Sequence, residues 1–206
     1  MSRFRESLAG AKSCETREAV NGGVYPPSED TFLLLDCLEE GEGLALELGC
    51  GSGVVALQLA KYGWRVVATD INEEAVRETR KLLEREVMGR RVSLVVGDLL
   101  SPFRDGVGFE LLVFNAPYVP HDEPPASTSD LAWHGGKTGR RWINRIINDI
   151  STRGFRVKKI FLVQSAASDP SRTHRKLQSM GYDTRIVGSK SDFFDEIVAI
   201  KAARPV

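Results

Sequence analysis

Residues 44–60, LALELGCGSGVVALQLA, constrain this chain more than any other stretch. The first five are apolar enough for a buried strand, and residues 54–60 are good helix formers with apolar side chains on more than one face. Gly49, Gly51 and Gly53 lie between these halves and leave room only for a tight turn. Glycine tolerates positive φ and lets a ligand lie against the main chain. The stretch therefore predicts the start of a nucleotide-binding βαβ unit.

The acids near this turn indicate which ligand it binds. The dinucleotide fingerprint G-x-G-x-x-G needs glycine at position 54, where this chain has Val54. Glu47 would repel a pyrophosphate, but it would attract the sulfonium and ammonium charges of S-adenosylmethionine. Asp70 follows the second expected strand, where an acid can bind both ribose hydroxyls, and Asp98 repeats this placement after the third. We therefore favour a methyltransferase over a nicotinamide enzyme.

Length and composition limit the number of domains and the classes of partner that the chain can have. The 206 residues suit one well-buried α/β domain, assigned to residues 24–206, with residues 1–23 as an N-terminal extension. Lysine plus arginine and aspartate plus glutamate both number 28, so the zero net charge gives no support to a broad electrostatic grip on nucleic acid. Three scattered cysteines suit neither a disulfide framework nor a zinc site. With no apolar run of membrane-spanning length and no secretory signal, we expect a cytoplasmic protein without a metal or a membrane partner.

The hydrophobic pattern predicts seven strands with interleaved helices. The expected strands are residues 44–48, 65–69, 92–96, 111–114, 159–163, 184–187 and 193–201, and the expected helices are residues 32–38, 54–60, 72–86, 140–152 and 171–180. A short Gly-Ser-Lys-Ser-Asp turn at residues 188–192 predicts that the last two strands are antiparallel. In the third of these helices, Asn72 is the expected N-cap, and Val76, Leu83 and Val87 form the expected apolar stripe.

Residues 24–31, VYPPSEDT, come just before the first helix and allow two interpretations. The two prolines favour an extended approach, and Ser28 or Asp30 can cap the helix that follows. The segment is also polar and aromatic close to the glycine turn, which equally suits a lid over a ligand. Both interpretations stay open.

Residues 121–139 form a long polar loop after the fourth expected strand. Loops of this length inside a compact domain are usually functional or disordered, and the Trp133 and glycine content favours a functional loop here. His121 and His134 are tempting as bases. We expect instead that they are loop histidines without a fixed partner.

Residues 115–118, Asn-Ala-Pro-Tyr, resemble the [DNS]-P-P-[YF] motif of methyltransferases that act on nitrogens conjugated to a planar system. Such a nitrogen is a poor nucleophile because its lone pair is delocalised, so the site must hold the NH₂ group and align it with the methyl donor. The resemblance implies that the Asn115 side-chain oxygen and the Ala116 carbonyl accept from the NH₂. It also implies that Pro117 belongs to the same site and that Tyr118 packs on the planar group. Ala116 replaces the usual first proline, which keeps the carbonyl but reduces the rigidity.

From residue 24 onward the chain resembles one branch of this group, the HemK-like release-factor glutamine methyltransferases of eukaryotes and archaea. The resemblance is carried by a Y-x-P-S-E-D-T-like segment at 25–31, the cofactor loop at 47–53, the acids in 69–72 and 97–99, and a W-x-G-G-x-x-G-like loop at 133–139. It implies a Rossmann-like class I methyltransferase sheet of seven strands, mostly parallel with an antiparallel last strand and helices on both faces. It further implies S-adenosylmethionine as cofactor and the glutamine of a release factor's Gly-Gly-Gln loop as substrate.

The same resemblance assigns the site and a partner. The residues that it places at the cofactor are Thr31, Glu47, Gly49, Gly51, Gly53, Asp70, Asp98, Leu99 and Asn115, and those at the target are Asn115, Ala116, Pro117 and Tyr118. Eukaryotic and archaeal relatives pair with a small zinc-binding activator, so we expect a Trm112-like partner at the apolar strand 92–96, which in this fold lies at a sheet edge. Two alternatives remain: an N6-adenine or N2-guanine methyltransferase on DNA or RNA, and a non-catalytic S-adenosylmethionine-binding subunit.

Overall fold

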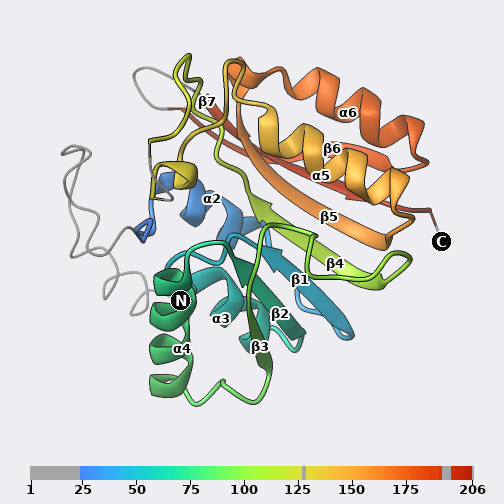
Figure 1. The fold of residues 1–206 in the computed structure, drawn as a ribbon. Coiled ribbons are helices and arrows are strands. Elements are labelled where there is room, and N and C mark those ends of the chain that lie inside the picture. The colour runs from blue at the N-terminus through green and yellow to red at the C-terminus, as the bar shows by residue number, and fades with distance from the viewer. Residues whose placement is uncertain (1–23, 127–128, 192–195, 206) are drawn as a thin grey trace.

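One seven-stranded sheet forms the centre of the protein (Figure 1). The computed structural model describes residues 24–126, 129–191 and 196–205, so the predicted extension at 1–23 lies outside the described residues. The strands lie in the order β3-β2-β1-β4-β5-β7-β6, and β7 runs antiparallel to both of its neighbours while the other pairs are parallel. This confirms the predicted sheet. The strands are β1 Leu44–Leu48, β2 Arg65–Asp70, β3 Val92–Val96, β4 Gly108–Asn115, β5 Arg156–Ser165, β6 Asp183–Ser191 and β7 Glu196–Ala203.

Helices cover both faces of the sheet, as predicted. The helices are α2 Glu29–Cys37, α3 Val54–Lys61 and α4 Glu73–Arg85 on one face, and α5 Arg141–Thr152 and α6 Pro170–Ser179 on the other. Successive side chains of β4 alternate between the two layers: Leu111 and Val113 pack with α2–α4, whereas Leu112 and Phe114 pack with α5 and α6. The central strands are therefore buried on both sides, which explains their continuous apolar sequences.

The register of the central strands brings polar side chains to one edge of the sheet. Leu48 of β1 is aligned with Thr69 of β2 and with Phe114 of β4. Because the three strands are parallel, the residues that follow, Asp70 and Asn115, lie at the same end of the sheet as Glu47. The carboxyl ends of these strands are therefore where a site can form.

The predicted turn at residues 188–192 is wrong for its first four positions. β6 continues through Ser191, and Gly188 is paired with Ala199 of β7 across an irregularity that follows Ile186. The residues look like a turn because β6 is the last strand of the sheet and its polar side chains are mostly exposed. Residues 192–195, which include the start of the predicted last strand, lie outside the described residues.

The ends of two helices also test the predictions. Ser28 is the N-cap of α2, which confirms the capped entry, but the helix begins at Glu29, three residues before the predicted start. Asn72 caps α4, and its side-chain oxygen accepts from the Glu74 N–H at 3.0 Å. The predicted apolar stripe of α4 is wrong at Val87, which lies beyond the helix with φ 57° and is 88% exposed. Across the described ranges, no helix has both the length and the apolar character needed to cross a membrane.

Candidate active site

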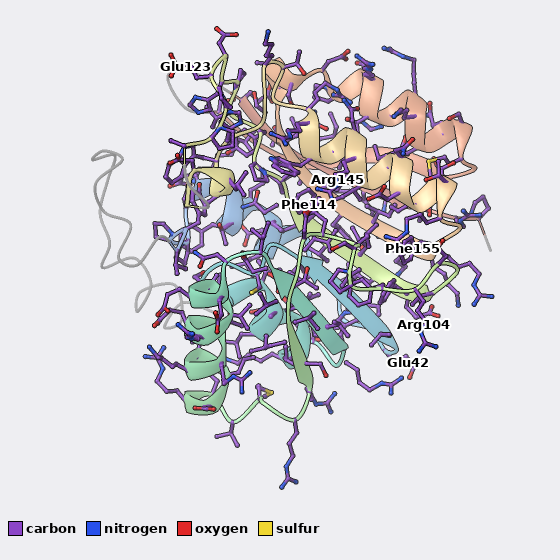
Figure 2. All side chains as sticks on the ribbon, viewed as in Figure 1. Glu42, Arg104, Phe114, Glu123, Arg145 and Phe155 are labelled. Atoms are coloured by element: carbon purple, nitrogen blue, oxygen red, sulfur yellow. The ribbon has the colours of Figure 1, made fainter. Side chains whose placement is uncertain are left out.

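A cavity opens at the carboxyl ends of β1, β2 and β4, next to the start of α2. Figure 2 shows Phe114, one of its lining residues, near the centre of the molecule, with Glu123 at one end and Glu42 at the other. The cavity brings together all but one of the predicted site residues. Those that line it are Thr31, Glu47, Gly49, Gly51, Asp70, Asp98, Leu99, Asn115, Ala116, Pro117 and Tyr118.

The glycine turn after β1 depends on left-handed backbone at all three glycines. Gly49, Gly51 and Gly53 have φ angles of 69°, 50° and 83°, a backbone region that residues other than glycine rarely adopt. Gly53 is the predicted site residue that does not line the cavity. It is the N-cap of α3, and a Cβ there would lie 2.8 Å from the side chain of Thr79 on α4. Its glycine is therefore required for helix packing.

Glu47 is a buried carboxyl group with an unused acceptor. Its side chain points to the α3 side of β1, it is 3% exposed, and Oε2 has no hydrogen-bond partner within the described part of the chain. Burial raises the pKa of Glu47 well above its usual range, the charge of Asp70 raises it further, and a backbone hydrogen bond from Ala56 offsets part of this effect. Such a group stabilises a cation or a donor that enters the cavity.

Asp70 links the second strand to the glycine turn. Its Oδ2 accepts from the Gly51 N–H at 2.9 Å, and its Oδ1 accepts from the Asn72 N–H at 2.8 Å. Burial raises the pKa of Asp70, and these backbone hydrogen bonds oppose the rise. Each carboxylate oxygen can accept more than one hydrogen bond, so Asp70 can bind a ligand hydroxyl while it holds the turn.

Asp98 and Leu99 form the wall of the cavity after β3. Arg145 of α5 makes a bidentate pair with Asp98, with distances of 3.0 Å to Oδ1 and 2.7 Å to Oδ2 (Figure 2 shows Arg145 on its helix). Leu99 has φ 51°, which is strained for a residue with a side chain and is typical of ligand sites. Arg145 was missed from the sequence, because its pairing with Asp98 spans 47 residues.

The Asn-Ala-Pro-Tyr segment begins at the last residue of β4. Asn115 Oδ1 is buried and, among the described residues, has no hydrogen-bond partner. Ala116 is 2% exposed, and the Tyr118 hydroxyl donates to Asp30 Oδ2 at 3.2 Å. An unpaired buried acceptor costs free energy, and its presence at a cavity wall indicates a place for a donor from a ligand.

The loop at residues 133–139 holds the backbone of Tyr118. A Cβ on Gly135 would lie 2.8 Å from the carbonyl carbon of Tyr118, and a Cβ on Gly139 would also meet the Tyr118 backbone. Gly135 donates its N–H to the Val119 carbonyl at 2.8 Å. These two glycines allow the loop to pack directly against the target motif, which gives a physical reason for the first and last glycines of the W-x-G-G-x-x-G pattern.

The prediction that the loop histidines lack a fixed partner is wrong for His134. His134 is buried, and its Nδ1 accepts from the Gly136 N–H at 3.1 Å. Its Nε2 therefore carries the proton and donates to the Glu123 carbonyl, and its ring stacks on that of His121 with centroids 4.9 Å apart. Neither histidine lines the cavity. The two rings pack against each other within the described part of the loop.

Several other residues of the cavity wall are not among the predicted site residues, and Tyr25, Asp30 and Trp142 are three of them. The sequence signal for Tyr25 and Asp30 is the segment at residues 25–31, which carries part of the family resemblance and in which Asp30 is also a candidate helix cap. Trp142 is buried at the start of α5 and donates from Nε1 to the His134 carbonyl at 2.7 Å. Its position gave no signal beyond the apolar face of a helix.

The fold and the site define the class of the protein. A sheet of this order with an antiparallel β7, a glycine turn after β1 and an acid at the end of β2 is the architecture of class I methyltransferases. The family model described as a methyltransferase domain matches residues 45–133.

Similar proteins give the family within this class. A protein of Methanocaldococcus jannaschii, provisionally named a protein N5-glutamine methyltransferase, is 31% identical over 186 residues, which cover 88% of this chain and 92% of the relative. Methyltransferase HEMK2 of Mus musculus is 37% identical over 176 residues, which cover 77% of this chain and 79% of the relative. A solved E. cuniculi Mtq2–Trm112 complex, described as responsible for methylation of the termination factor eRF1, matches with a TM-score of 0.70, 29% identity, and coverage of 89% of this chain and 99% of the matched chain. The chain belongs to the HemK-like family of class I methyltransferases.

Proposed function

We propose that this enzyme transfers a methyl group from S-adenosylmethionine to the side-chain nitrogen of the glutamine in the Gly-Gly-Gln loop of a class I release factor. The observation that carries the proposal is Asn115 Oδ1, a buried acceptor in the cavity wall that has no hydrogen-bond partner in the described ranges. Together with the Ala116 carbonyl, this acceptor suits a ligand NH₂ group, which has two N–H donors to orient, better than a hydroxyl or a thiol, which has one donor. The names of the archaeal relative and of the E. cuniculi complex support glutamine and a termination factor as the substrate.

The cofactor proposal rests on the fit of the donors and acceptors in the cavity. Glu47 Oε2 is a carboxyl oxygen with no partner among the described residues, and the cationic methionine end would favour its ionised form. The left-handed backbone at the glycines lets a ligand approach the main chain. Asp70 retains acceptor capacity for the ribose hydroxyls. Thr31, Asp98 and Leu99 complete the binding residues, with Asp98 on the adenine side. S-adenosylmethionine supplies a methyl group activated by its positive sulfur.

The chain's own contribution at the target is orientation. Asn115 Oδ1 and the Ala116 carbonyl hold the amide NH₂, and Tyr118 provides an aromatic surface for the planar group, beside Pro117. Holding the nitrogen at close range and in line removes much of the entropic barrier for a weak nucleophile. The burial of Asn115 Oδ1 strengthens its hydrogen bond because bulk water does not compete for it.

The test is single-turnover transfer of a labelled methyl group to a release factor, with mass spectrometry to locate the label. The control substrate is the same release factor with alanine in place of the loop glutamine. Label on the glutamine of the first substrate and none on the second is the expected result. Transfer to tRNA, rRNA or DNA instead would establish a base-amine methyltransferase. Cofactor binding without transfer to any of these would favour a non-catalytic subunit.

We also propose that a small zinc-binding activator of the Trm112 kind docks on β3. β3 lies at the end of the sheet, so one side of its backbone has no neighbouring strand among the described residues. Val96 is 52% exposed, and Val95 is half-buried beside it. An apolar edge strand of this kind is a template for strand addition by a partner. The proposal is supported by the solved association of E. cuniculi Mtq2 with Trm112.

Val96→Glu tests this docking site, because Leu94 packs against the core and its replacement would disturb the fold. A buried glutamate at the interface should abolish co-purification with the activator and leave the melting temperature of the isolated chain unchanged. Val87→Glu is the matched control, since Val87 is 88% exposed outside β3. Retention of the partner by the Val96 variant would exclude this strand as the docking site.

A further inference from the structure

One buried carboxylate joins the segment before α2 to the target motif. Asp30 is 3% exposed, and its Oδ2 lies 3.2 Å from the hydroxyl of Tyr25 and 3.2 Å from the hydroxyl of Tyr118. Tyr25 and Tyr118 both line the cavity, although Tyr118 and Asp30 are 88 residues apart in sequence. A single oxygen thus anchors two aromatic rings of the cavity wall.

The other oxygen of Asp30 is fixed within its own helix. Oδ1 accepts from the Thr31 N–H at 2.6 Å and from the Thr31 hydroxyl at 3.2 Å. Asp30 also lies in the first turn of α2, where the helix dipole favours a negative charge. The carboxylate is therefore held by the helix through one oxygen and presents the other to the tyrosines with little freedom to move.

The Tyr25 hydroxyl is a hydrogen-bond donor to Asp30 Oδ2. Its burial raises its pKa, and the neighbouring charge of Asp30 raises it further, so the phenol stays protonated. Its hydroxyl oxygen also lies 3.2 Å from Ser28 Oγ. One phenolic proton serves one acceptor and the carboxylate is the stronger one, so the Ser28 hydroxyl donates to Tyr25.

We propose that Asp30 is a positioning residue for methyl transfer, which acts by fixing the ring of Tyr118 at the target site. The inference rests on the proposed function of that site and adds a residue to it. Because the Tyr118 hydroxyl is engaged by Asp30, the ring meets the substrate through its face and not through a hydrogen bond. A ring held in one orientation restricts the planar amide to one orientation, which affects the rate of transfer more than the affinity for the cofactor.

The test compares Asp30→Asn, Tyr118→Phe and the double variant in single-turnover methyl transfer, with cofactor titration and thermal melting. Each single change should slow transfer by about 10-fold, because misplacement of the reacting group by a fraction of an ångström to an ångström has effects of this order or larger. The double variant should be no more than about 3-fold slower than the slower single variant, because both changes remove the same contact. Cofactor affinity should change less than about 3-fold in Tyr118→Phe, because that variant leaves the contacts between Asp30 and the cofactor residue Thr31 in place. Asp36→Asn, an exposed carboxylate on the same helix, is the matched control and should transfer at the normal rate.

The results that overturn the proposal are a normal transfer rate for Asp30→Asn, a double variant whose losses multiply, or a rate loss in Tyr118→Phe that is matched by an equal loss of cofactor affinity. If Asp30→Asn does not fold, Tyr118→Phe keeps the start of α2 intact, and a normal rate for that variant overturns the proposal.

An NMR measurement on ring-labelled tyrosine separates this proposal from the proposed function. Asp30→Asn should shift the signals of Tyr25 and Tyr118 and leave those of Tyr62 and Tyr182 unchanged, whatever the substrate is. Unchanged signals for Tyr25 and Tyr118 overturn the role of Asp30. Shifted signals in an enzyme that does not methylate the release factor would overturn the proposed function alone.

Discussion

Replacing Glu47 by glutamine tests two effects of this residue separately. One is its effect on the free energy of unfolding, and the other is its effect on cofactor affinity. In the folded protein the carboxyl group is buried and lies near the charge of Asp70, and its Oε2 has no partner within the described ranges. The raised pKa means that the folded state favours the neutral form, so ionisation of Glu47 destabilises the fold as pH rises above the usual carboxyl range. Glutamine has nearly the same shape and stays neutral. We therefore expect Glu47→Gln to be more stable than the wild type at neutral pH, by about 1–2 kcal/mol.

The magnitude and its pH dependence can be measured by thermal melting. For a domain of this size, each kcal/mol corresponds to about 2–4 °C in melting temperature. The gain should be absent at a pH below the unfolded-state pKa of glutamate, where both proteins carry a neutral side chain, and it should grow as pH rises. Glu42→Gln is the matched control, because Glu42 is an exposed carboxylate at the opposite end of β1 (Figure 2).

The same variant should bind the cofactor more weakly. Loss of a charge-assisted hydrogen bond to a cationic group costs about 1.5–3 kcal/mol, which corresponds to roughly 10- to 150-fold in Kd. Calorimetry with S-adenosylmethionine measures this loss, and the wild-type affinity should rise with pH as Glu47 ionises, while that of the variant should not. Unchanged affinity would refute the role of Glu47 in binding. A melting temperature that falls, or rises equally at every pH, would refute the argument from burial.

Three further changes test other parts of the site. Asn115→Ala should slow single-turnover transfer by about 100-fold, which is a loss of about 2.7 kcal/mol in transition-state stabilisation. Cofactor affinity should change much less, and a near-normal rate would remove Asn115 from the target site. Asp70→Asn should weaken cofactor binding in calorimetry by about 10-fold or more, because an amide cannot accept the ribose hydroxyls as a carboxylate does, and unchanged affinity would contradict this. Gly135→Ala should slow transfer without a matching loss of cofactor affinity, since the new methyl group would lie 2.8 Å from the Tyr118 backbone carbon. Equal losses of rate and affinity in that variant would show a general disturbance of the fold.

The sequence predicted the fold best where local patterns and tertiary packing agree. Residues 44–48 and 92–96 were predicted with the strand bounds that the structure has, and the helix after the glycine turn was predicted to within one residue. These segments are apolar runs between clear turn signals. The predicted strand is shorter than β6, because the polar residues of this exposed edge strand are also typical of a turn. Its pairing with β7 overrides that local preference.

The candidate site was predictable where topology determines it. Parallel strands end at one edge of the sheet, so the acids near the carboxyl ends of β1, β2 and β3 could be assigned to one cavity from the sequence alone. The contacts of Asp30, Arg145 and His134 were not predictable, because each depends on partners that only the fold brings together. The sequence separation of 88 residues between Asp30 and Tyr118 is the largest example.

Two buried acceptors lower the stability of the fold and are available to bind a ligand. Most buried polar groups in folded proteins are paired, so Glu47 Oε2 and Asn115 Oδ1, which have no partner among the residues that the structure describes, need an explanation. Both lie in the wall of one cavity, and both are attached to strands that are buried on each face and cannot easily relax around them. Folding loses free energy because these two oxygens leave water without gaining a hydrogen bond. A ligand that brings a cation to Glu47 Oε2 and an NH₂ group to Asn115 Oδ1 restores that free energy. The melting temperature should therefore rise with cofactor concentration, and this rise should be smaller in Glu47→Gln, because the variant has less cost left for the ligand to recover.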